Sequence, residues 1–319
     1  MKLIIDTDPG VDDAFALLFA LAHPQLEVVG VTTVGGNVGL DAVTRNASGL
    51  IALSARHYDF NIPQLFKGLQ AEGRERAEAV HGAGGLGGVV LDAETPVKEG
   101  AVEYIVRTLR SSPGQIHLVA LGPLTNIAAA LELEPELPKL AAGLSIMGGA
   151  ERGGNVGNAA EFNIWQDPKA AEKVFKAKWR SLAMCGLDAT NQATFTPDLR
   201  ELCFQAGRDG NEVGALLHDI TRDYINRDWQ ANRVLGCRIH DLLPVALLVN
   251  PRITEYVEAK VRVQVGGPYD GRTVVTRSTG TVKVYTDTTN NSMLMGLFMK
   301  TLFPKFKARY KVDVASRLS

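Results

Sequence analysis

Residues 3–18 read LIIDTDPGVDDAFALL, and this stretch decides the fold. The apolar run at its start predicts a buried strand, and the Ala/Leu-rich run after Asp13 predicts a helix. Pro9 and Gly10 stand between the two runs, and both residue types favour a reversal of the backbone. The chain is therefore expected to begin with a strand, a tight turn and a helix.

Four aspartates fall within this stretch, with no lysine or arginine among them: Asp6, Asp8, Asp12 and Asp13. Two carboxylates ~4 Å apart repel each other by roughly 4 kcal/mol at an effective dielectric constant near 20. Folding the four side chains together requires a cation, a proton or divergent directions. An acidic first helical turn, favoured by the helix macrodipole, would explain Asp12 and Asp13 but not the other two. The cluster predicts a site for a hard metal ion.

Spacing separates three kinds of protein that carry such clusters. An EF-hand loop that starts at Asp6 requires Gly at its sixth position and Glu at its twelfth, where Val11 and Leu17 stand. A haloacid-dehalogenase-type phosphatase, which would use Mg²⁺ and Asp6 as nucleophile, normally has Thr or Val where Gly10 stands. The segment DTDPGVDD at 6–13 resembles instead the N-terminal signature of the nucleoside hydrolases, calcium-dependent N-ribohydrolases.

Composition argues against several classes of partner. Hydrophobic residues at 45% and charged residues at 22% of the 319 positions are ordinary globular values. A net charge of −1 supplies no electrostatic reason to bind nucleic acid or an anionic membrane. The first strand follows Met1-Lys2 directly and no apolar run reaches ~18 residues, so we expect neither a signal peptide nor a membrane span. Three scattered cysteines without CxxC spacing predict reduced thiols in a cytoplasmic protein.

Strands and helices are expected to alternate along the rest of the chain. We expect strands at 26–34, 115–121, 144–147 and 181–184, an extended piece near 60–63, and helices at 40–56, 72–80, 97–110, from 122 onward and at 169–177. The last third predicts one long or two short helices at 210–233, a helix after His240, three strands at 256–265, 273–276 and 282–285 around Gly/Pro turns, and a final helix at 291–303. The pattern predicts an α/β fold: a single open, mostly parallel sheet covered by helices on both faces, with a mixed C-terminal part. No repeat or linker interrupts it, which predicts one domain over 1–319.

Polar and Gly-rich segments follow the predicted strands at their carboxyl ends. They are residues 6–13 after the first strand, 35–37 after the second, Gly122, and Gly148-Gly149. Because open α/β sheets bind ligands beyond the carboxyl ends of their strands, these segments predict one cleft at one edge of the sheet.

The segment NVGNAAEFN at 155–163 concentrates amides and a carboxylate in a Gly-rich loop. Such groups suit a polyhydroxylated ligand, because an amide both donates and accepts hydrogen bonds and a carboxylate accepts them from hydroxyls. The alternative is a solvated loop with Asx turns. The order Asn, then Glu-Phe-Asn, is also similar to the ribose-binding segment of nucleoside hydrolases.

Two histidines have both a functional and an ordinary interpretation. His240-Asp241 precedes an apolar run at 242–248, so Asp241 could simply cap a helix. In the family, a His-Asp pair at this point supplies a leaving-group acid and a calcium ligand. His81 begins HGAGGLG, a formal GxGxxG, but a predicted helix precedes it where the dinucleotide fingerprint needs a strand. The family has here a mobile loop whose His faces the nucleobase; the alternative is a surface histidine.

The resemblance to nucleoside hydrolases covers four separated segments, at 6–13, 121–126, 155–163 and 240–241. It implies Ca²⁺ held by the side chains of Asp8, Asp13 and Asp241 and by the backbone carbonyl of Leu121. The family often has Thr in place of Leu121, a change that a carbonyl ligand tolerates.

The resemblance also assigns the other roles. Asp8 would be the general base for the attacking water and His240 the acid for the leaving base. The remaining residues would bind substrate: Asp12 and Asn163 the 2′- and 3′-hydroxyls, Asn155 and Glu161 the 5′-hydroxyl, Met147 the ribose, and His81 the base, while Asn37 orients Asp8.

The predicted function is calcium-dependent hydrolysis of the N-glycosidic bond of ribonucleosides to free base and ribose, by a homodimer or homotetramer. The alternatives are a non-catalytic nucleoside- or ribose-binding protein and the Asp-nucleophile phosphatase. His at position 240 resembles the branch that acts on purine or uridine nucleosides. The choice of base stays open, and loops at 72–88 and 220–235, with Tyr224 and Trp229, are expected to read it.

Overall fold

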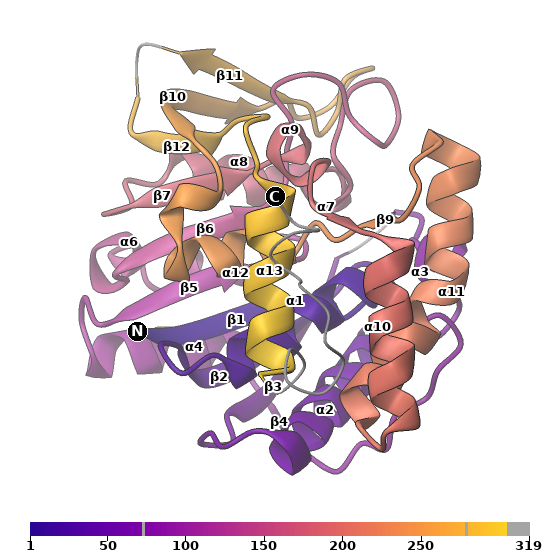
Figure 1. Ribbon diagram of the computed structural model, residues 1–319. Coiled ribbons are helices and arrows are strands. Elements are labelled where there is room, and N and C mark those ends of the chain that lie inside the picture. Colours follow the sequence, from indigo (N-terminus) through magenta and orange to yellow (C-terminus); the bar gives the residue numbers. More distant parts are fainter. Residues whose placement is uncertain (72–73, 278–279, 305–319) are drawn as a thin grey trace.

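A computed structural model describes residues 1–71, 74–277 and 280–304, and one large sheet runs through it (Figure 1). The strands of this sheet are β1 (Lys2–Thr7), β2 (Glu27–Gly35), β3 (Gln64–Gln70), β4 (Val97–Glu99), β5 (Ile116–Ala120), β6 (Gly143–Met147), β7 (Leu182–Cys185), β10 (Tyr256–Val263), β11 (Thr273–Arg277) and β12 (Val282–Tyr285). Their order is β11-β10-β12-β7-β6-β5-β1-β2-β3-β4. All neighbours pair in parallel except β10, which is antiparallel to both β11 and β12.

Helices cover both faces of the sheet, as predicted. One face carries α1 (Val11–Ala22), α2 (Leu40–His57), α10 (Pro197–Arg208), α11 (Glu212–Asn232), α12 (Leu242–Val249) and α13 (Asn291–Leu302). The other carries α4 (Ala101–Ser111), α5 (Thr125–Leu133), α6 (Leu137–Leu140) and α8 (Pro168–Lys176). Short elements complete the chain: α3 (Glu78–His81), α7 (Phe162–Gln166), α9 (Leu187–Thr190), η1 (Pro251–Ile253) and the paired strands β8 (Thr194–Phe195) and β9 (Cys237–Arg238).

The first strand lies inside the sheet because its side chains are apolar on both faces. Leu3 and Ile5 pack into the core beneath α1, whereas Ile4 packs into the core on the opposite face. This alternation follows from the two-residue period of a strand. Since β1 pairs with both β2 and β5, Asp6 at its carboxyl end is held between two neighbouring strands.

The turn after β1 leads at once into a buried helix. The backbone N–H of Gly10 donates to Asp13 Oδ2 at 2.9 Å, which caps the first turn of α1. Further along the helix, Phe15 stacks on Phe298 and meets Phe195 edge-on, with ring centroids 5.1 and 5.0 Å apart. The core therefore fixes the helix, and the helix fixes the aspartates of its first turn.

Two predicted boundaries were wrong. The helix expected at 97–110 begins only at Ala101, because Val97–Glu99 forms β4 beside β3 and Gly100 takes a left-handed conformation with φ 85°. The extended piece near 60–63 precedes the true strand, β3. The region 210–233 agrees with the first of its two predicted alternatives, because it forms one long helix, α11.

The helix expected at 72–80 is reduced to α3, and residues 72–73 lie outside the described part. Tertiary contacts hold the preceding residues in another conformation. The Arg74 guanidinium lies 4.6 Å from the Trp165 ring and pairs with Asp270, and Gln166 donates to the Glu75 carbonyl at 2.7 Å.

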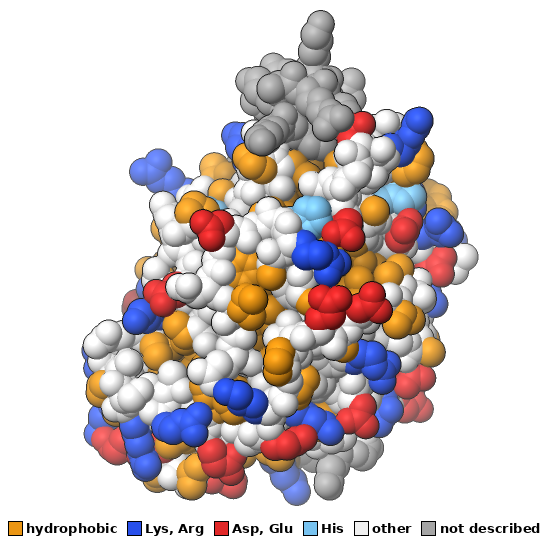
Figure 2. All heavy atoms as spheres, turned by 90° about the horizontal axis from the view of Figure 1, so that it is seen from below, with side chains coloured by type: hydrophobic (Ala, Val, Ile, Leu, Met, Phe, Trp, Pro, Cys, Tyr) orange, Lys and Arg blue, Asp and Glu red, His pale blue; other side chains and the backbone are white. Residues whose placement is uncertain are grey.

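The C-terminal part extends the same sheet rather than forming a second one. β12 joins β7 in parallel, and β10 then adds the antiparallel pairing. Residues 305–319 lie outside the described residues, so one domain over 1–319 stays a prediction. None of the described helices is both long and apolar enough to span a bilayer. On the face drawn in Figure 2, acidic and basic side chains are interspersed rather than gathered by sign.

Candidate active site

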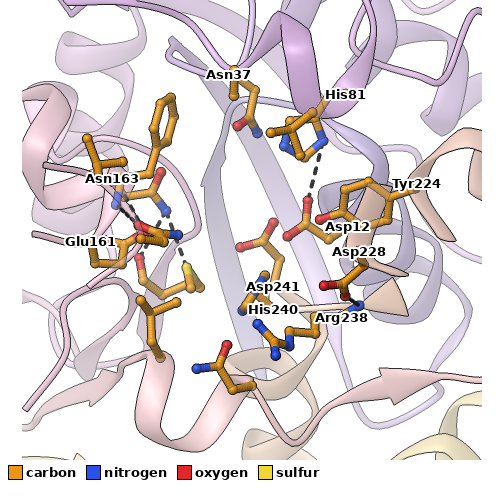
Figure 3. A pocket seen from close by; sticks show the side chains of 18 of the residues that line it. Asp12, Asn37, His81, Glu161, Asn163, Tyr224, Asp228, Arg238, His240 and Asp241 are labelled. Carbon is orange, nitrogen blue, oxygen red and sulfur yellow. Dashed lines mark hydrogen bonds and ion pairs between the residues drawn. The ribbon is translucent and has the colours of Figure 1, made fainter. Parts of the chain in front are cut away.

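A cavity of about 550 Å³ opens at the carboxyl ends of the central strands (Figure 3). Asp12 and Asp241 lie at its centre, Glu161 and Asn163 on one side, and Tyr224 on the other. Its volume suits a small organic ligand. The predicted cleft is therefore present at the predicted edge of the sheet.

Asp13 is held beneath the cavity by three donors. Its carboxylate accepts hydrogen bonds from Thr7 Oγ1 at 2.5 Å, from the Gly10 N–H at 2.9 Å and from Asn37 Nδ2 at 3.1 Å. Asp13 thus caps α1 and still faces Asp12 and Asp241. The capping interpretation and the site interpretation both hold for this residue.

Asp8 lies beside Asp13 and is fully buried. Its Oδ2 accepts the backbone N–H of Asn37 at 2.7 Å, so Asn37 contacts this carboxylate through its backbone, and its side chain donates to the Asp8 carbonyl and to Asp13. Asp8 Oδ1 is buried without a hydrogen-bond partner. A Cβ at Gly36 or Gly122 would come within 2.3 or 2.4 Å of this carboxylate, so only glycine leaves room for it.

Asp12, Asp13 and Asp241 form a buried group whose oxygen atoms lie within 4.8 Å of one another. Asp241 occupies the N-cap position of α12, but its side chain makes no capping hydrogen bond. Helix capping therefore does not account for Asp241.

Burial sets the protonation of this cluster. It raises the pKa of Asp12 to about 8, with the Asp13 charge adding to the shift. It also raises the pKa of Asp8 and of Asp241 well above the ordinary value, aided by the charges of Asp13 and of Asp12 respectively. Burial and mutual repulsion therefore favour a proton or a cation on this cluster.

The donor set fits a hard cation. Asp8 Oδ1 and Asp12 Oδ1 are buried oxygens without partners, and no lysine or arginine among the described residues pairs with the cluster. Carboxylate and carbonyl oxygens are the ligands that Ca²⁺ and Mg²⁺ prefer. The predicted carbonyl ligand, Leu121, lines the cavity and accepts a hydrogen bond from Asn163 Nδ2 at 2.7 Å.

One side of the cavity is built by the loop and helix at 155–163. Glu161 is the N-cap of α7, and its carboxylate accepts the backbone N–H groups of Gly149 and Asn163 at 3.0 Å and of Ile164 at 3.2 Å. Asn163 Nδ2 also donates to the Met147 carbonyl at 3.2 Å. Asn155 is exposed, and its Oδ1 accepts the Phe162 N–H at 2.9 Å. Glu161 and Asn163 are therefore not part of a freely solvated loop, whereas Asn155 is exposed as a residue of such a loop would be.

His81 and Tyr224 lie together on the opposite side, with ring centroids 5.4 Å apart. His81 is buried, so the surface interpretation was wrong. Its Nδ1 accepts the Val11 N–H at 3.1 Å and lies 3.8 Å from Asp12 Oδ1. Burial lowers the pKa of His81 to about 3, which keeps the ring neutral with its proton on Nε2.

His240 lines the cavity beside Asp241 and Arg238 (Figure 3), and its Nδ1 lies 2.8 Å from Thr190 Oγ1. Burial, and then the positive charge of Arg238, lower the pKa of His240 to about 4. The neutral imidazole is therefore favoured in the ligand-free site.

Ten of the twelve predicted site residues line the cavity, while Asp8 and Asp13 lie beneath it. Sequence reasoning missed the supporting residues Thr7 and Thr190 and the lining residues Asn191, Asp228 and Arg238. Thr7 stood within the quoted motif, and Arg238 two residues before His240; Thr190 and Asn191 had no signal in the sequence. The GxGxxG at 82–87 follows the helix α3 and not a strand, as expected.

A buried carboxylate cluster that can hold a metal lies beside a pocket lined by amides, carboxylates and histidines, so this α/β fold carries the groups that a metal-dependent hydrolase uses. The sequence model of the inosine-uridine preferring nucleoside hydrolases matches residues 3–295. The chain belongs to this family, whose members hydrolyse the N-glycosidic bond of ribonucleosides.

Its relatives differ in the base that their names give. The chain is 38% identical over 280 residues to the pyrimidine-specific ribonucleoside hydrolase RihB of Escherichia coli O1:K1. The aligned residues make up 86% of each chain. A purine-preferring ribonucleoside hydrolase from Gardnerella vaginalis superposes with a TM-score of 0.86 at 32% identity, over 97% of this chain and 100% of that one. A plant nucleoside hydrolase, PpNRh1, superposes with a TM-score of 0.82 at 33% identity, over 94% of this chain and 98% of that one.

Proposed function

We propose that the enzyme is calcium-dependent and that Asp8, Asp13, Asp241 and the Leu121 carbonyl hold the ion. The observation that carries this proposal is the set of buried aspartate oxygens without a cationic partner. Bound calcium would neutralise the carboxylates and act as a Lewis acid toward water and the ribose hydroxyls.

Asp8 is the general base in this proposal. Its Oδ1 is buried, unpartnered and placed where Gly36 and Gly122 leave space, so it can take one proton from the attacking water. The water oxygen joins C1′ as the bond between C1′ and the base nitrogen breaks. The sugar passes through an oxocarbenium-like state that the nearby carboxylates stabilise.

His240 supplies the proton that the departing base takes up. Because burial and Arg238 favour the neutral ring, the proposal requires that negative charge developing on the base raises the proton affinity of His240. Thr190 Oγ1 at 2.8 Å from Nδ1 orients the ring for this transfer.

The ribose lies between the aspartates and α7. Asp12 Oδ1 and Asn163 Oδ1 make no hydrogen bond within the described residues, so both can accept from the 2′- and 3′-hydroxyls. Glu161 would accept the 5′-hydroxyl, held in place by its three backbone donors, with Asn155 at the outer rim and Met147 against the sugar. The base then extends toward His81 and Tyr224.

We further infer a homodimer or homotetramer in the cytoplasm. The three cysteines are buried free thiols, the state that a reducing compartment maintains. Light scattering of the purified protein tests the assembly, and a monomer would contradict it.

One assay tests the reaction and the metal together. The enzyme, exhaustively chelated and then supplied with calcium, is incubated with inosine and with uridine, and free ribose and free base are measured. We expect equal amounts of both products from at least one substrate, lost on chelation and restored by calcium. Full activity in verified metal-free protein would sink the calcium proposal, and absence of ribose under all conditions would sink the assignment of the reaction.

A further inference from the structure

We propose that Arg238 binds an acceptor atom of the nucleobase and stabilises the negative charge that develops on the base as it departs. The proposal rests on the placement of the base on the Tyr224 side of the cavity. Arg238 ends β9, lines the cavity and lies beside His240 (Figure 3).

The backbone of Arg238 is anchored while its charge is left without a partner. Its N–H donates to Asp228 Oδ2 at 3.0 Å. Its Nε is buried and makes no hydrogen bond, and no carboxylate within the described residues lies at ion-pair distance from its guanidinium. A buried donor without an acceptor is unfavourable, so the structure reserves this group for a ligand.

Other arginines of the protein show the contrast. Arg74 pairs with Asp270, Arg152 with Asp287, and Arg277 with Glu151. Arg227, the second arginine of the cavity, donates to the Ala79 carbonyl. Arg238 alone among these five has no acceptor.

The chemistry of the guanidinium identifies the part of the substrate that it meets. Arginine carries five N–H donors, no acceptor and a permanent charge, so its partner is a carbonyl oxygen or a ring nitrogen. The ribose carries hydroxyls and lies toward Asp12 and Asn163, which leaves the base. When the bond to C1′ breaks, its electron pair moves onto the base nitrogen, and a fixed positive charge nearby stabilises that state. The proton that the base gains still comes from His240.

The test compares two kinds of leaving group in the calcium-loaded enzyme. Arg238→Met should lower kcat/KM for uridine or inosine by on the order of 10²-fold, as does removal of other preorganised donors. The p-nitrophenyl riboside has no base carbonyl or ring nitrogen and leaves as a stable anion, so its hydrolysis should be nearly unchanged. Arg238→Lys keeps the charge and should fall between wild type and Arg238→Met for the nucleosides.

Arg222→Met is the matched control, because Arg222 is exposed on α11 and lies outside the cavity lining. It should leave all substrates unchanged. Equal loss on nucleosides and p-nitrophenyl riboside, or no loss on either, would overturn the role of Arg238. If Arg238→Met does not fold, as its melting curve will show, Arg238→Gln takes its place in the same comparison. Wild-type protein that releases no base from any riboside would instead refute the proposed function.

Discussion

The two sides of the cavity are built differently. On the proposed ribose side, formed by the aspartates and α7, buried backbone and side-chain donors fix the functional groups: Asp13 accepts three hydrogen bonds and Glu161 accepts three. On the proposed base side, formed by His81, Tyr224 and the end of α11, two large apolar side chains near the cavity are exposed, Trp229 at 48% and Leu235 at 72%.

This difference matches the chemistry of the substrate. The sugar is common to all ribonucleosides, and rigid strand ends can hold it with precision. The base varies, and the relatives named above differ in the base that they prefer. We infer that the ribose side holds the part of the substrate common to all ribonucleosides, whereas the base side activates the leaving group through His240 and Arg238 and selects the base. The following predictions test that division.

The largest effect is expected from removing a ribose hydroxyl. If Asp12 and Asn163 grip the 2′- and 3′-hydroxyls, a 2′-deoxynucleoside leaves buried polar groups unpaired, commonly a loss of about 10⁴-fold. Steady-state kcat/KM for inosine and 2′-deoxyinosine measures it. Comparable values would show that the site does not bind the 2′-hydroxyl, and they would contradict the inference that the ribose side holds the sugar.

The next effect separates acid from metal ligand at adjacent positions. His240→Ala should slow inosine or uridine hydrolysis by roughly 10²- to 10⁴-fold, because the base leaves poorly without a proton. It should spare p-nitrophenyl riboside. Asp241→Ala should damage both substrates, because it disturbs the ribose side. If His240→Ala slows both equally, the histidine positions substrate instead of donating a proton.

The cluster should make calcium binding depend on pH with a defined sign. The pKa of Asp12 is about 8 against an ordinary value near 4, so the folded protein binds this proton more tightly than the unfolded chain does. The resulting contribution to folding stability is present at low pH and is lost as the pH rises toward 8. Burial also raises the pKa of the proposed ligands Asp8 and Asp241 well above the ordinary value. Calcium displaces protons from this cluster, so its affinity should rise with pH by about tenfold per unit for each proton displaced. Calorimetry between pH 6 and 8 tests this, and a calcium-induced rise in melting temperature should grow over the same range. A pH-independent affinity would contradict the protonated cluster.

The smallest effect is expected at Thr190. Thr190→Val removes one hydrogen bond to His240 and should lower kcat/KM for nucleosides by up to about tenfold, the equivalent of ~1.4 kcal/mol. The loss for p-nitrophenyl riboside should be smaller, since that substrate needs little help from His240. A larger loss on p-nitrophenyl riboside would place Thr190 in the ribose side instead.

Motifs with strong local chemistry were predictable, and contacts made only by tertiary folding were not. The aspartates, Glu161 and Asn163 stood in recognisable segments beside predicted strands or helices. The proximity of Thr190 to His240 depends on α9 and β9 meeting in space. The three residues of β4 had no periodicity of their own and form a strand because β3 offers an open edge. The helix expected at 72–80 is reduced to α3 because Arg74 contacts Trp165 and Asp270 instead.

The central position of β1 has a consequence for biosynthesis. This strand is synthesised before both of its neighbours in the sheet, β2 and β5, and the second of these begins only at Ile116. Asp241, which completes the carboxylate cluster, follows much later still. A nascent chain therefore holds this acidic and apolar segment without its second sheet neighbour until β5 has been made, and non-local pairing of this kind is slow and open to aggregation. The site that binds substrate is among the last features of the molecule to come into existence.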